Sequence, residues 1–328
     1  MKVKNILLAI LTAGCIFTAT GCTPKSTPGN IAEISVQDGD TVAEIEIEGY
    51  GVIKVKLFPD LAPKAVENFT LLAEEGYYDG LKIHRVLSGH FMQGGSLNGD
   101  GTGGSALVDP SGEFDIEIDK QARNFYGALG CPNVNGKNTA QFYIVNNKTP
   151  AVDYTQLDPA AFKTQAEELT VTRDAIEDTE SAEYAMLNAQ ITHYNNLSDM
   201  VSGASEEVKQ KYNTVGGDPF LDGGYTVFGQ MYEGFDVLDS IANVKVVTNN
   251  VGEASRPTTD IIIGSVKVYK VTVSTAESGD NSNNSSPAAS TPAPSAPSEP
   301  DSSATSEPSS SATSEPDTAT IETTEGAA

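Results

Sequence analysis

The chain has 328 residues and a formal net charge of −25, with 45 acidic and 20 basic residues. Such a charge repels phosphate backbones and anionic lipid headgroups, so we expect no nucleic-acid partner. Beyond the N-terminal leader the only cysteine is Cys131, and the three histidines share no ligand spacing, so the sequence predicts no intrachain disulfide, no metal site and no cofactor.

Residues 1–22 have a basic start, an apolar middle and a small-residue end, which is typical of a secretory signal peptide. The apolar run is too short for a membrane-spanning helix. Its end, Thr20-Gly21-Cys22, resembles a bacterial lipoprotein processing site, which would make Cys22 the lipidated first residue. Cys15 is an alternative lipidation site, and an ordinary cleaved signal is another alternative. We therefore expect an extracytoplasmic protein held at the cell membrane by a lipid anchor.

A polar tether is expected over residues 23–38, followed by two alternating segments at 41–47 and 53–57. Their acids and lysines occupy the polar positions, which predicts a hairpin with a charged outer face. Residues 59–76 carry one apolar stripe, with a proline in the first turn and a glycine at the end, and predict a helix.

The stretch 81–104 combines one cation, one amide and a glycine-rich loop. Alternation predicts a strand with Ile83 and Arg85 on one face and His84 and Val86 on the other. An arginine among apolar neighbours is unusual unless it lines a groove. We interpret the stretch as a groove with a fixed cation and an apolar floor.

Further strands are expected at 114–118, 141–145, 225–230 and 261–273, with a short helix at 235–241. Residues from about 150 to 214 become acidic and helical, which predicts a helical hairpin inserted into a β domain. We favour a hairpin that packs on the β domain over a separate partner-binding arm.

The tail, residues 275–328, is rich in Ser, Thr, Pro and Glu, and it contains nine acids and no Lys or Arg. Such a composition cannot bury a core and predicts disorder.

Six segments, in this order, resemble the motifs of the cyclophilin family of peptidyl-prolyl cis-trans isomerases. They are FPDLAPKAVENF, YYDGLKIHRV, FMQGGSLNGDGTGG, AQFYIV, FLDGGYTVFGQMYEGFDVLDSIA and RPTTDIIIGSV. The resemblance implies a mainly β domain over residues 39–274, a closed eight-stranded antiparallel barrel capped by two helices. The inserted helical hairpin would interrupt it, and we expect a monomer.

The resemblance also assigns site residues. Arg85 matches the catalytic arginine and Gln93 the glutamine beside it. Further positions match the family's substrate-binding residues: His90, Phe91, Gly101, Thr102, Gly103, Asn133, Gln141, Tyr143, Phe220, Leu221 and Tyr225.

Several of these positions depart from the family pattern. His90 and Tyr143 stand where phenylalanine is usual, Phe220 replaces a tryptophan and Tyr225 a histidine. Pro132 replaces a small residue. These changes affect the shape of the pocket but leave the arginine and glutamine in place.

The function implied is isomerisation of Xaa-Pro bonds in exported polypeptides, which would assist their folding. Arg85 would stabilise the twisted prolyl amide over an apolar pocket. An alternative is a weakly or non-catalytic module that binds proline peptides through the altered pocket and the helical insert. A third hypothesis makes the anchor and acidic tail the essential parts, with the β domain as a spacer.

Overall fold

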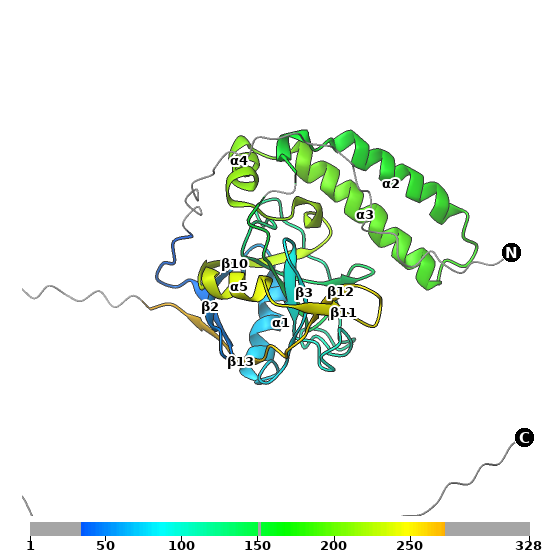
Figure 1. The fold of residues 1–328 in the computed structure, drawn as a ribbon. Coiled ribbons are helices and arrows are strands. Elements are labelled where there is room, and N and C mark those ends of the chain that lie inside the picture. The colour runs from blue at the N-terminus through cyan, green and yellow to red at the C-terminus, as the bar shows by residue number, and fades with distance from the viewer. Residues whose placement is uncertain (1–33, 150–151, 273–328) are drawn as a thin grey trace, which may run out of the picture. The chain divides into compact units, whose positions relative to one another are not determined.

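A computed structural model describes residues 34–149 and 152–272 (Figure 1). The expected signal peptide, the lipidated Cys22, most of the tether and the 275–328 tail lie outside the described residues. Within the described ranges, no helix has the length and apolar character needed to span a bilayer.

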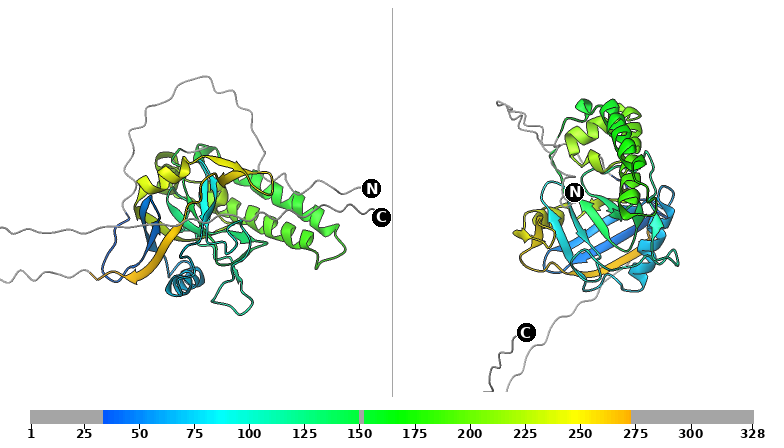
Figure 2. Two further views of the ribbon diagram at one scale, coloured as in Figure 1. Left: turned by 60° about the horizontal axis from the view of Figure 1, so that its bottom comes forward. Right: turned by 90° about the vertical axis from the view of Figure 1, so that its right-hand side faces the viewer.

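The main sheet has eight antiparallel strands in the order β13-β1-β2-β10-β6-β9-β4-β3. Their bounds are β1 Thr41–Ile47, β2 Gly51–Leu57, β3 Ile83–Leu87, β4 Phe91–Gly94, β6 Ala128–Cys131, β9 Phe142–Val145, β10 Thr226–Glu233 and β13 Ile263–Lys270. The sheet curls strongly, as two further views show (Figure 2). Its edge strands β3 and β13 meet only at an isolated bridge between Lys82 and Ile262. The expected closed barrel is therefore wrong: the ladder stops at both edges and leaves a curled half-barrel.

The β1–β2 hairpin forms as the alternation predicts. Ile45 lies opposite Ile53, and both are fully buried. Glu44 lies opposite Lys54 on the outer face, with their charged atoms 3.8 Å apart. The period of two thus separates an apolar inner face from a charged outer face.

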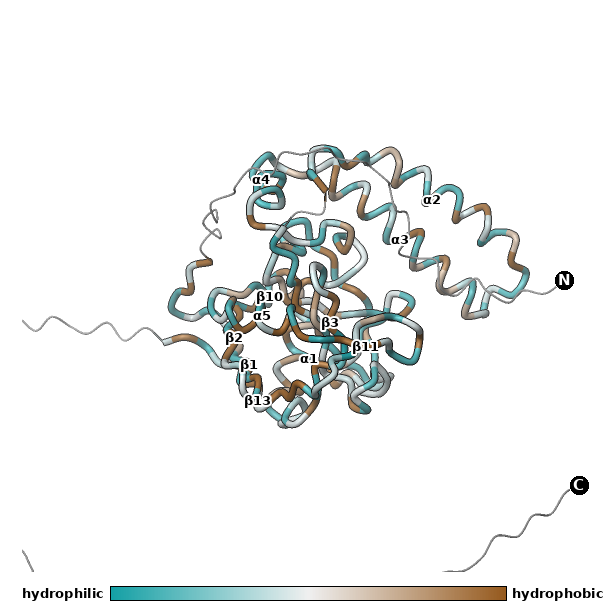
Figure 3. Tube along the Cα trace, viewed as in Figure 1, coloured by the Kyte–Doolittle hydropathy of each residue, from teal (hydrophilic) through white to brown (hydrophobic). Residues whose placement is uncertain are grey.

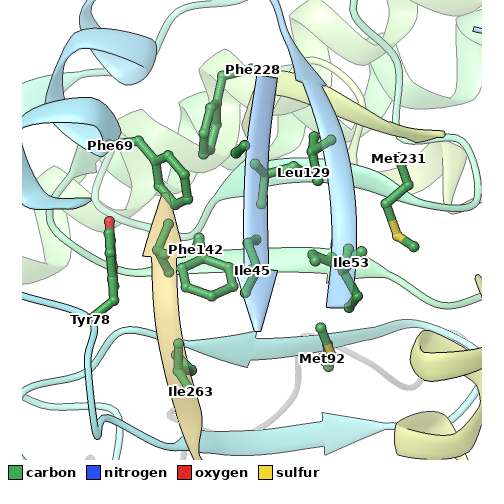
Figure 4. Packing of buried hydrophobic residues seen from close by; sticks show 14 of the residues in the cluster. Ile45, Ile53, Phe69, Tyr78, Met92, Leu129, Phe142, Phe228, Met231 and Ile263 are labelled. Carbon is green, nitrogen blue, oxygen red and sulfur yellow. The ribbon is translucent and has the colours of Figure 1, made fainter. Parts of the chain in front are cut away.

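Two helices, α1 (Pro63–Glu74) and α5 (Phe235–Ala242), contribute side chains to the same apolar core as the sheet. Phe69 of α1 packs in this core beside Phe228 and Phe142 (Figure 4). Its ring centroid is 5.3 Å from that of Phe228 on β10 and 5.8 Å from that of Phe142 on β9. The core therefore fixes α1 against both halves of the sheet.

Five short strands lie outside the main sheet. They are β5 Phe114–Asp115, β7 Asn133–Val134 and β8 Lys137–Asn138 in one small sheet, and β11 Val246–Thr248 and β12 Ala254–Pro257 in a hairpin. The strand expected at 114–118 is therefore only two residues long and belongs to a small sheet.

Glu117, just beyond β5, contacts the start of helix α1. Its carboxylate accepts hydrogen bonds from the backbone N–H groups of Lys64 and Ala65, at 3.1 and 2.9 Å. These are the first amides of α1, whose N-cap residue Ala62 offers no side-chain acceptor. A carboxylate from outside the helix thus caps its N-terminus and interacts favourably with the partial positive charge there.

Three helices lie between β9 and β10 in the chain: α2 (Pro159–Asp174), α3 (Ala182–Ser202) and α4 (Glu206–Val215). Each begins at a side-chain cap, from Asp158, Ser181 and Ser205 respectively. Helices α2 and α3 run side by side (Figures 1 and 2), and polar and apolar residues are interspersed along both (Figure 3). That this segment is an insertion relative to the family stays a prediction.

The helical segment packs on the β domain through a second apolar cluster. Tyr212 of α4 stacks on Tyr154 of a short 3-10 helix (Tyr154–Gln156), with ring centroids 4.9 Å apart. The Tyr212 ring also packs against that of Phe125, which precedes β6, with ring centroids 4.5 Å apart. Leu197 of α3 belongs to the same cluster. The C-terminal end of α3 and helix α4 are therefore anchored to the half-barrel, while the far ends of α2 and α3 extend beyond it (Figure 1).

Candidate active site

An irregularity in β3 directs Arg85 away from the core. Ile83 pairs with Gly94 of β4, but Arg85 pairs with the adjacent residue Gln93, so His84 is an extra residue in the ladder. The bulge places Ile83 and Val86 in the same buried core. The prediction that Ile83 and Arg85 share a face is therefore wrong. The same bulge sets the Arg85 side chain directly across from Gln93.

The Arg85 guanidinium is held on several sides. Its Nη1 donates to Oε1 of Gln93 at 3.1 Å, and its Cζ lies 4.8 Å from the centroid of the Phe91 ring. Nε and Nη2 donate to the two carboxylate oxygens of Glu253, both at 2.7 Å. The Arg85 side chain keeps 30% of its surface exposed. It is thus an ordered cation that solvent and ligands can still reach.

A chain of side-chain amides continues from this cation. Gln93 Nε2 donates to Oε1 of Gln141 at 2.9 Å, and Gln141 Nε2 donates to the Gly101 carbonyl at 3.0 Å. Thr102, the next loop residue, donates its backbone N–H and its hydroxyl to Oδ1 of Asp100. The glycine-rich loop is therefore tied to the arginine through two fixed amides.

A small hollow of about 280 Å³ opens beside Arg85. Its lining is mainly aromatic and aliphatic: Arg85, Phe91, Gln93, Pro132, Tyr143, Leu221 and Tyr225. The Tyr143 ring lies 5.7 Å from Phe91 and 6.1 Å from Tyr225, measured between centroids. A hollow of this size, lined mainly by apolar side chains, suits one small apolar group.

Gly130 of β6 makes room for the Tyr143 ring. A Cβ at this position would lie 2.7 Å from Cε1 of Tyr143, closer than real contacts allow. Any larger residue at 130 would force the Tyr143 ring to shift. The glycine thus allows this wall of the pocket to take its observed position.

The family model for "Cyclophilin type peptidyl-prolyl cis-trans isomerase/CLD" matches residues 42–196 and 197–268. The chain belongs to the cyclophilin family. A Staphylococcus haemolyticus protein named "Putative peptidyl-prolyl cis-trans isomerase" is 35% identical over 222 residues, covering 66% of this chain and 86% of that protein. A Staphylococcus saprophyticus protein of the same name is 33% identical over 235 residues, covering 71% and 94%. These findings confirm the resemblance seen in the six motifs.

Solved cyclophilin structures are also similar to this chain. The crystal structure of a Cryptosporidium parvum cyclophilin type peptidyl-prolyl cis-trans isomerase has a TM-score of 0.46 and 20% sequence identity. The match covers 71% of this chain and 99% of that one.

Six of the predicted site residues line the pocket of this cyclophilin. They are Arg85, Gln93, Phe91, Tyr143, Leu221 and Tyr225. Gln141 and Gly101 join them through the amide chain, and Thr102 and Gly103 follow in the same loop. Pro132, which the sequence marked only as a departure from the family pattern, also lines the pocket.

Three other predicted residues neither line the pocket nor belong to the amide chain and its loop. Phe220 is 44% exposed and meets Phe162 of α2 edge to face, with centroids 6.3 Å apart. Asn133 donates its side-chain amide to the Gly224 carbonyl at 2.7 Å and accepts from the Gly136 N–H. Its side chain is therefore committed to the neighbouring loops.

His90 is the third of these residues. Its Nδ1 lies 3.1 Å from Oδ2 of Asp218, just before the short helix Pro219–Leu221. This hydrogen bond raises the pKa of His90 above its usual value, against the opposing effect of burial. His90 therefore links the β3–β4 turn to the segment that follows α4.

Sequence reasoning missed Glu253, Asp218 and Asn124. Glu253 ends a turn in which Asn249 Oδ1 accepts from the N–H groups of Val251 and Glu253, both at 3.0 Å. The letters NNVG indicate such a turn. No local signal could show that its glutamate meets an arginine 168 residues earlier.

Within residues 34–149 and 152–272, no group of three or more His, Cys, Asp or Glu side chains could hold a metal ion. Cys131 is buried, and burial raises the pKa of its thiol well above the usual value. It is therefore not a reactive nucleophile.

Proposed function

We propose that this cyclophilin catalyses the cis-trans isomerisation of Xaa-Pro bonds, with Arg85 as the residue that stabilises the twisted amide. The observation that carries the proposal is the ordered Arg85 guanidinium at the rim of a small apolar pocket. Phe91, Tyr143 and Leu221 would receive the proline ring, while the guanidinium would face the rotating peptide bond.

The chemistry needs no covalent step. Amide resonance opposes rotation with a barrier of roughly 20 kcal/mol. In the twisted state the proline nitrogen becomes pyramidal and can accept a hydrogen bond. A site accelerates rotation if it binds that state better than either planar form. A thousandfold gain requires about 4 kcal/mol, which a well-placed charged donor can supply.

Arg85 still has N–H groups that can donate to the twisted prolyl amide. A guanidinium has five N–H groups. Three of them donate to Gln93 and Glu253. The other two remain for a substrate amide. Gln93 is itself fixed by Gln141, so the guanidinium is oriented before a substrate arrives.

The export role and the domain plan are part of the proposal. Residues 1–22 would direct secretion, Cys22 would carry the lipid, and residues 23–38 would tether the 39–274 domain outside the membrane. The substrates would be Xaa-Pro segments of exported polypeptides, bound by a monomer, and residues 275–328 would be a disordered tail. A Cys22→Ser variant should leave the membrane fraction, as fractionation and immunoblotting would show.

The decisive experiment measures isomerisation of Xaa-Pro peptides by NMR exchange for the wild type, Arg85→Ala and Arg173→Ala. Arg173 is a matched control, because it is a partly buried arginine that stacks on Tyr184 in the helical segment. We expect Arg85→Ala to lose more than 90% of kcat/KM, while Arg173→Ala keeps it. Equal rates in all three proteins would reject the mechanism.

The salt bridge with Glu253 supports a second candidate, a module that binds proline peptides with little turnover. A bidentate carboxylate neutralises the cation and could reserve it as a structural group. Binding of a proline peptide with exchange at the uncatalysed rate would favour this candidate over the isomerase.

A further inference from the structure

We propose that Glu253 is a positioning residue for isomerisation, which holds the Arg85 guanidinium in the orientation that a twisted prolyl amide requires. The proposal rests on the proposed catalytic role of Arg85. Glu253 lies at the end of the turn between β11 and β12, outside all six motifs that resemble the family.

The contact between the two residues is bidentate. Glu253 Oε2 accepts from Arg85 Nε and Oε1 accepts from Nη2, each at 2.7 Å. The side chains are 30% and 28% exposed, so solvent screens the pair only in part. Two parallel bonds fix the plane of a guanidinium, whereas a single bond would allow it to swivel.

Three groups together clamp the cation. Glu253 takes the Nε and Nη2 edge, Gln93 takes one N–H of Nη1, and the Phe91 ring lies 4.8 Å from Cζ. The direction of the two remaining N–H groups is then determined by the fold. A donor that is already oriented avoids the cost of ordering in the transition state.

Glu253 is itself held in place by its turn. The Asn249 N–H donates to the Glu253 carbonyl at 2.7 Å, and the Glu253 N–H donates to Asn249 Oδ1 at 3.0 Å. Asn249 also donates to the hydroxyl of the buried Ser255 at 3.1 Å. The turn therefore carries the carboxylate on a rigid base.

The location of Glu253 and its negative charge also support a role in positioning Arg85. Strand β12 lies beside β3, the strand of Arg85 (Figure 1). The hydrogen bonds from Arg85 lower the pKa of Glu253, so the carboxylate is ionised at neutral pH. Both members of the pair are thus charged when the enzyme works.

The test compares the wild type with Glu253→Gln, Glu253→Asp and Arg85→Ala in the full chain, and with Glu233→Gln as a control. Glu233 forms a similar pair with Lys54, 3.0 Å apart, at the end of β10 and outside the pocket. For each protein, kcat and KM on an Xaa-Pro peptide are measured separately, along with Tm. The Arg85 Nε–H signal is followed by NMR.

We expect Glu253→Gln to lower kcat about tenfold and to change KM less than twofold, with a broadened Arg85 Nε–H signal. Glu253→Asp, which keeps the charge, should recover part of kcat, and Glu233→Gln should match the wild type. Because all rates are taken well below the lowest Tm, loss of folded protein cannot produce this pattern.

Two results would overturn the proposal in different ways. Unchanged or higher kcat in Glu253→Gln, with Arg85→Ala inactive, would show that Glu253 is only a counterion while the proposed function stands. A wild-type rate at the uncatalysed level would overturn the proposed function and the role of Glu253 with it.

Discussion

The Tyr143 hydroxyl donates a 2.6 Å hydrogen bond to Oδ1 of Asn124, a residue that does not line the pocket. Asn124 in turn donates its backbone and side-chain N–H groups to Oδ1 of Asp222, at 3.0 and 3.1 Å. A wall of the pocket is thus connected to a buried polar cluster that also contacts the helical segment.

We predict that Tyr143→Phe affects stability more than activity. The ring that lines the pocket would remain, but Asn124 Oδ1 would lose its donor in a buried site. The free energy of unfolding should fall by about 1–3 kcal/mol, and kcat/KM should stay within about twofold of the wild type, since the pocket surface is unchanged. Urea unfolding and the peptide assay would check both. Tyr50→Phe at an exposed position is the control, and a large loss of activity at normal stability would contradict the prediction.

The pair formed by Asp222 and Arg123 should dominate the attachment of the helical segment. Asp222 Oδ2 accepts from Arg123 Nη1 at 3.0 Å and from the Tyr212 hydroxyl at 2.8 Å. Arg123 also donates to the Met200 carbonyl of α3. Both charged side chains are almost fully buried. Asp222→Ala would leave the arginine charge without its partner, so we expect a loss of about 3–5 kcal/mol in unfolding free energy.

The exposed pair between Lys137 and Asp115 provides the control for this experiment. The carboxylate is 78% exposed and solvent screens the pair, so Asp115→Ala should destabilise the protein far less than Asp222→Ala. Chemical denaturation of both variants gives the comparison. Similar losses in the two would show that Asp222 is not the anchor.

His90 should titrate above its ordinary value. Its hydrogen bond with Asp218 raises the pKa in the folded state, so the protonated form is favoured by folding. This contribution to stability is fully present below pH of about 6.5 and is lost as pH rises through the raised pKa. NMR titration of the His90 ring should show the shift in the wild type, and Asp218→Asn should lower it. An identical pKa in the two proteins would exclude Asp218 as the cause.

The pKa of His84 should be shifted downward by folding, opposite to the shift of His90, so protonation of His84 lowers the stability of the folded protein. His84 is 8% exposed, and burial together with the nearby Arg85 charge lowers its pKa to about 4. In the unfolded chain the His84 ring takes up a proton near a pH of about 6.5. In the folded protein the ring stays neutral until about pH 4. Stability is therefore lost as pH falls through this interval, by about 3 kcal/mol in all.

Unfolding measured from pH 7 to pH 4.5 would test the His84 prediction. The wild type should lose more stability over this range than His84→Gln, whatever the difference between them at pH 7. His90 favours folding over part of the same interval, so the comparison requires both proteins to retain it. Parallel stability curves would show that His84 does not resist protonation.

The sequence predicted the elements whose pattern is local. Alternation identified β1 and β2, an apolar run identified the strand of Phe142, and the stripe containing Phe69 identified α1. The predictions were wrong where contacts with other parts of the chain determine the local structure. The strand expected at 114–118 covers only Phe114–Asp115, with Glu117 capping α1 instead, and the face of Arg85 changed because His84 is an extra residue in β3.

The candidate site was predicted to a similar extent. The motifs supplied Arg85, Gln93 and most of the pocket wall. They could not supply Glu253 or Asp218, because each meets its partner across more than a hundred residues of chain. The closed barrel failed for a related reason: amphipathic strands specify an inner face, but not whether the two edges pair.

The pairing of β1 with β13 has a consequence for the newly made polypeptide. Thr41 of β1 pairs with Lys270 of β13, so one edge of β1 stays unpaired until β13 has been synthesised. The carboxylate that orients Arg85 also comes late, at residue 253. A nascent chain that has emerged only as far as the helical segment would carry its arginine without the clamp. The enzyme would then acquire its activity only near the end of its own biosynthesis.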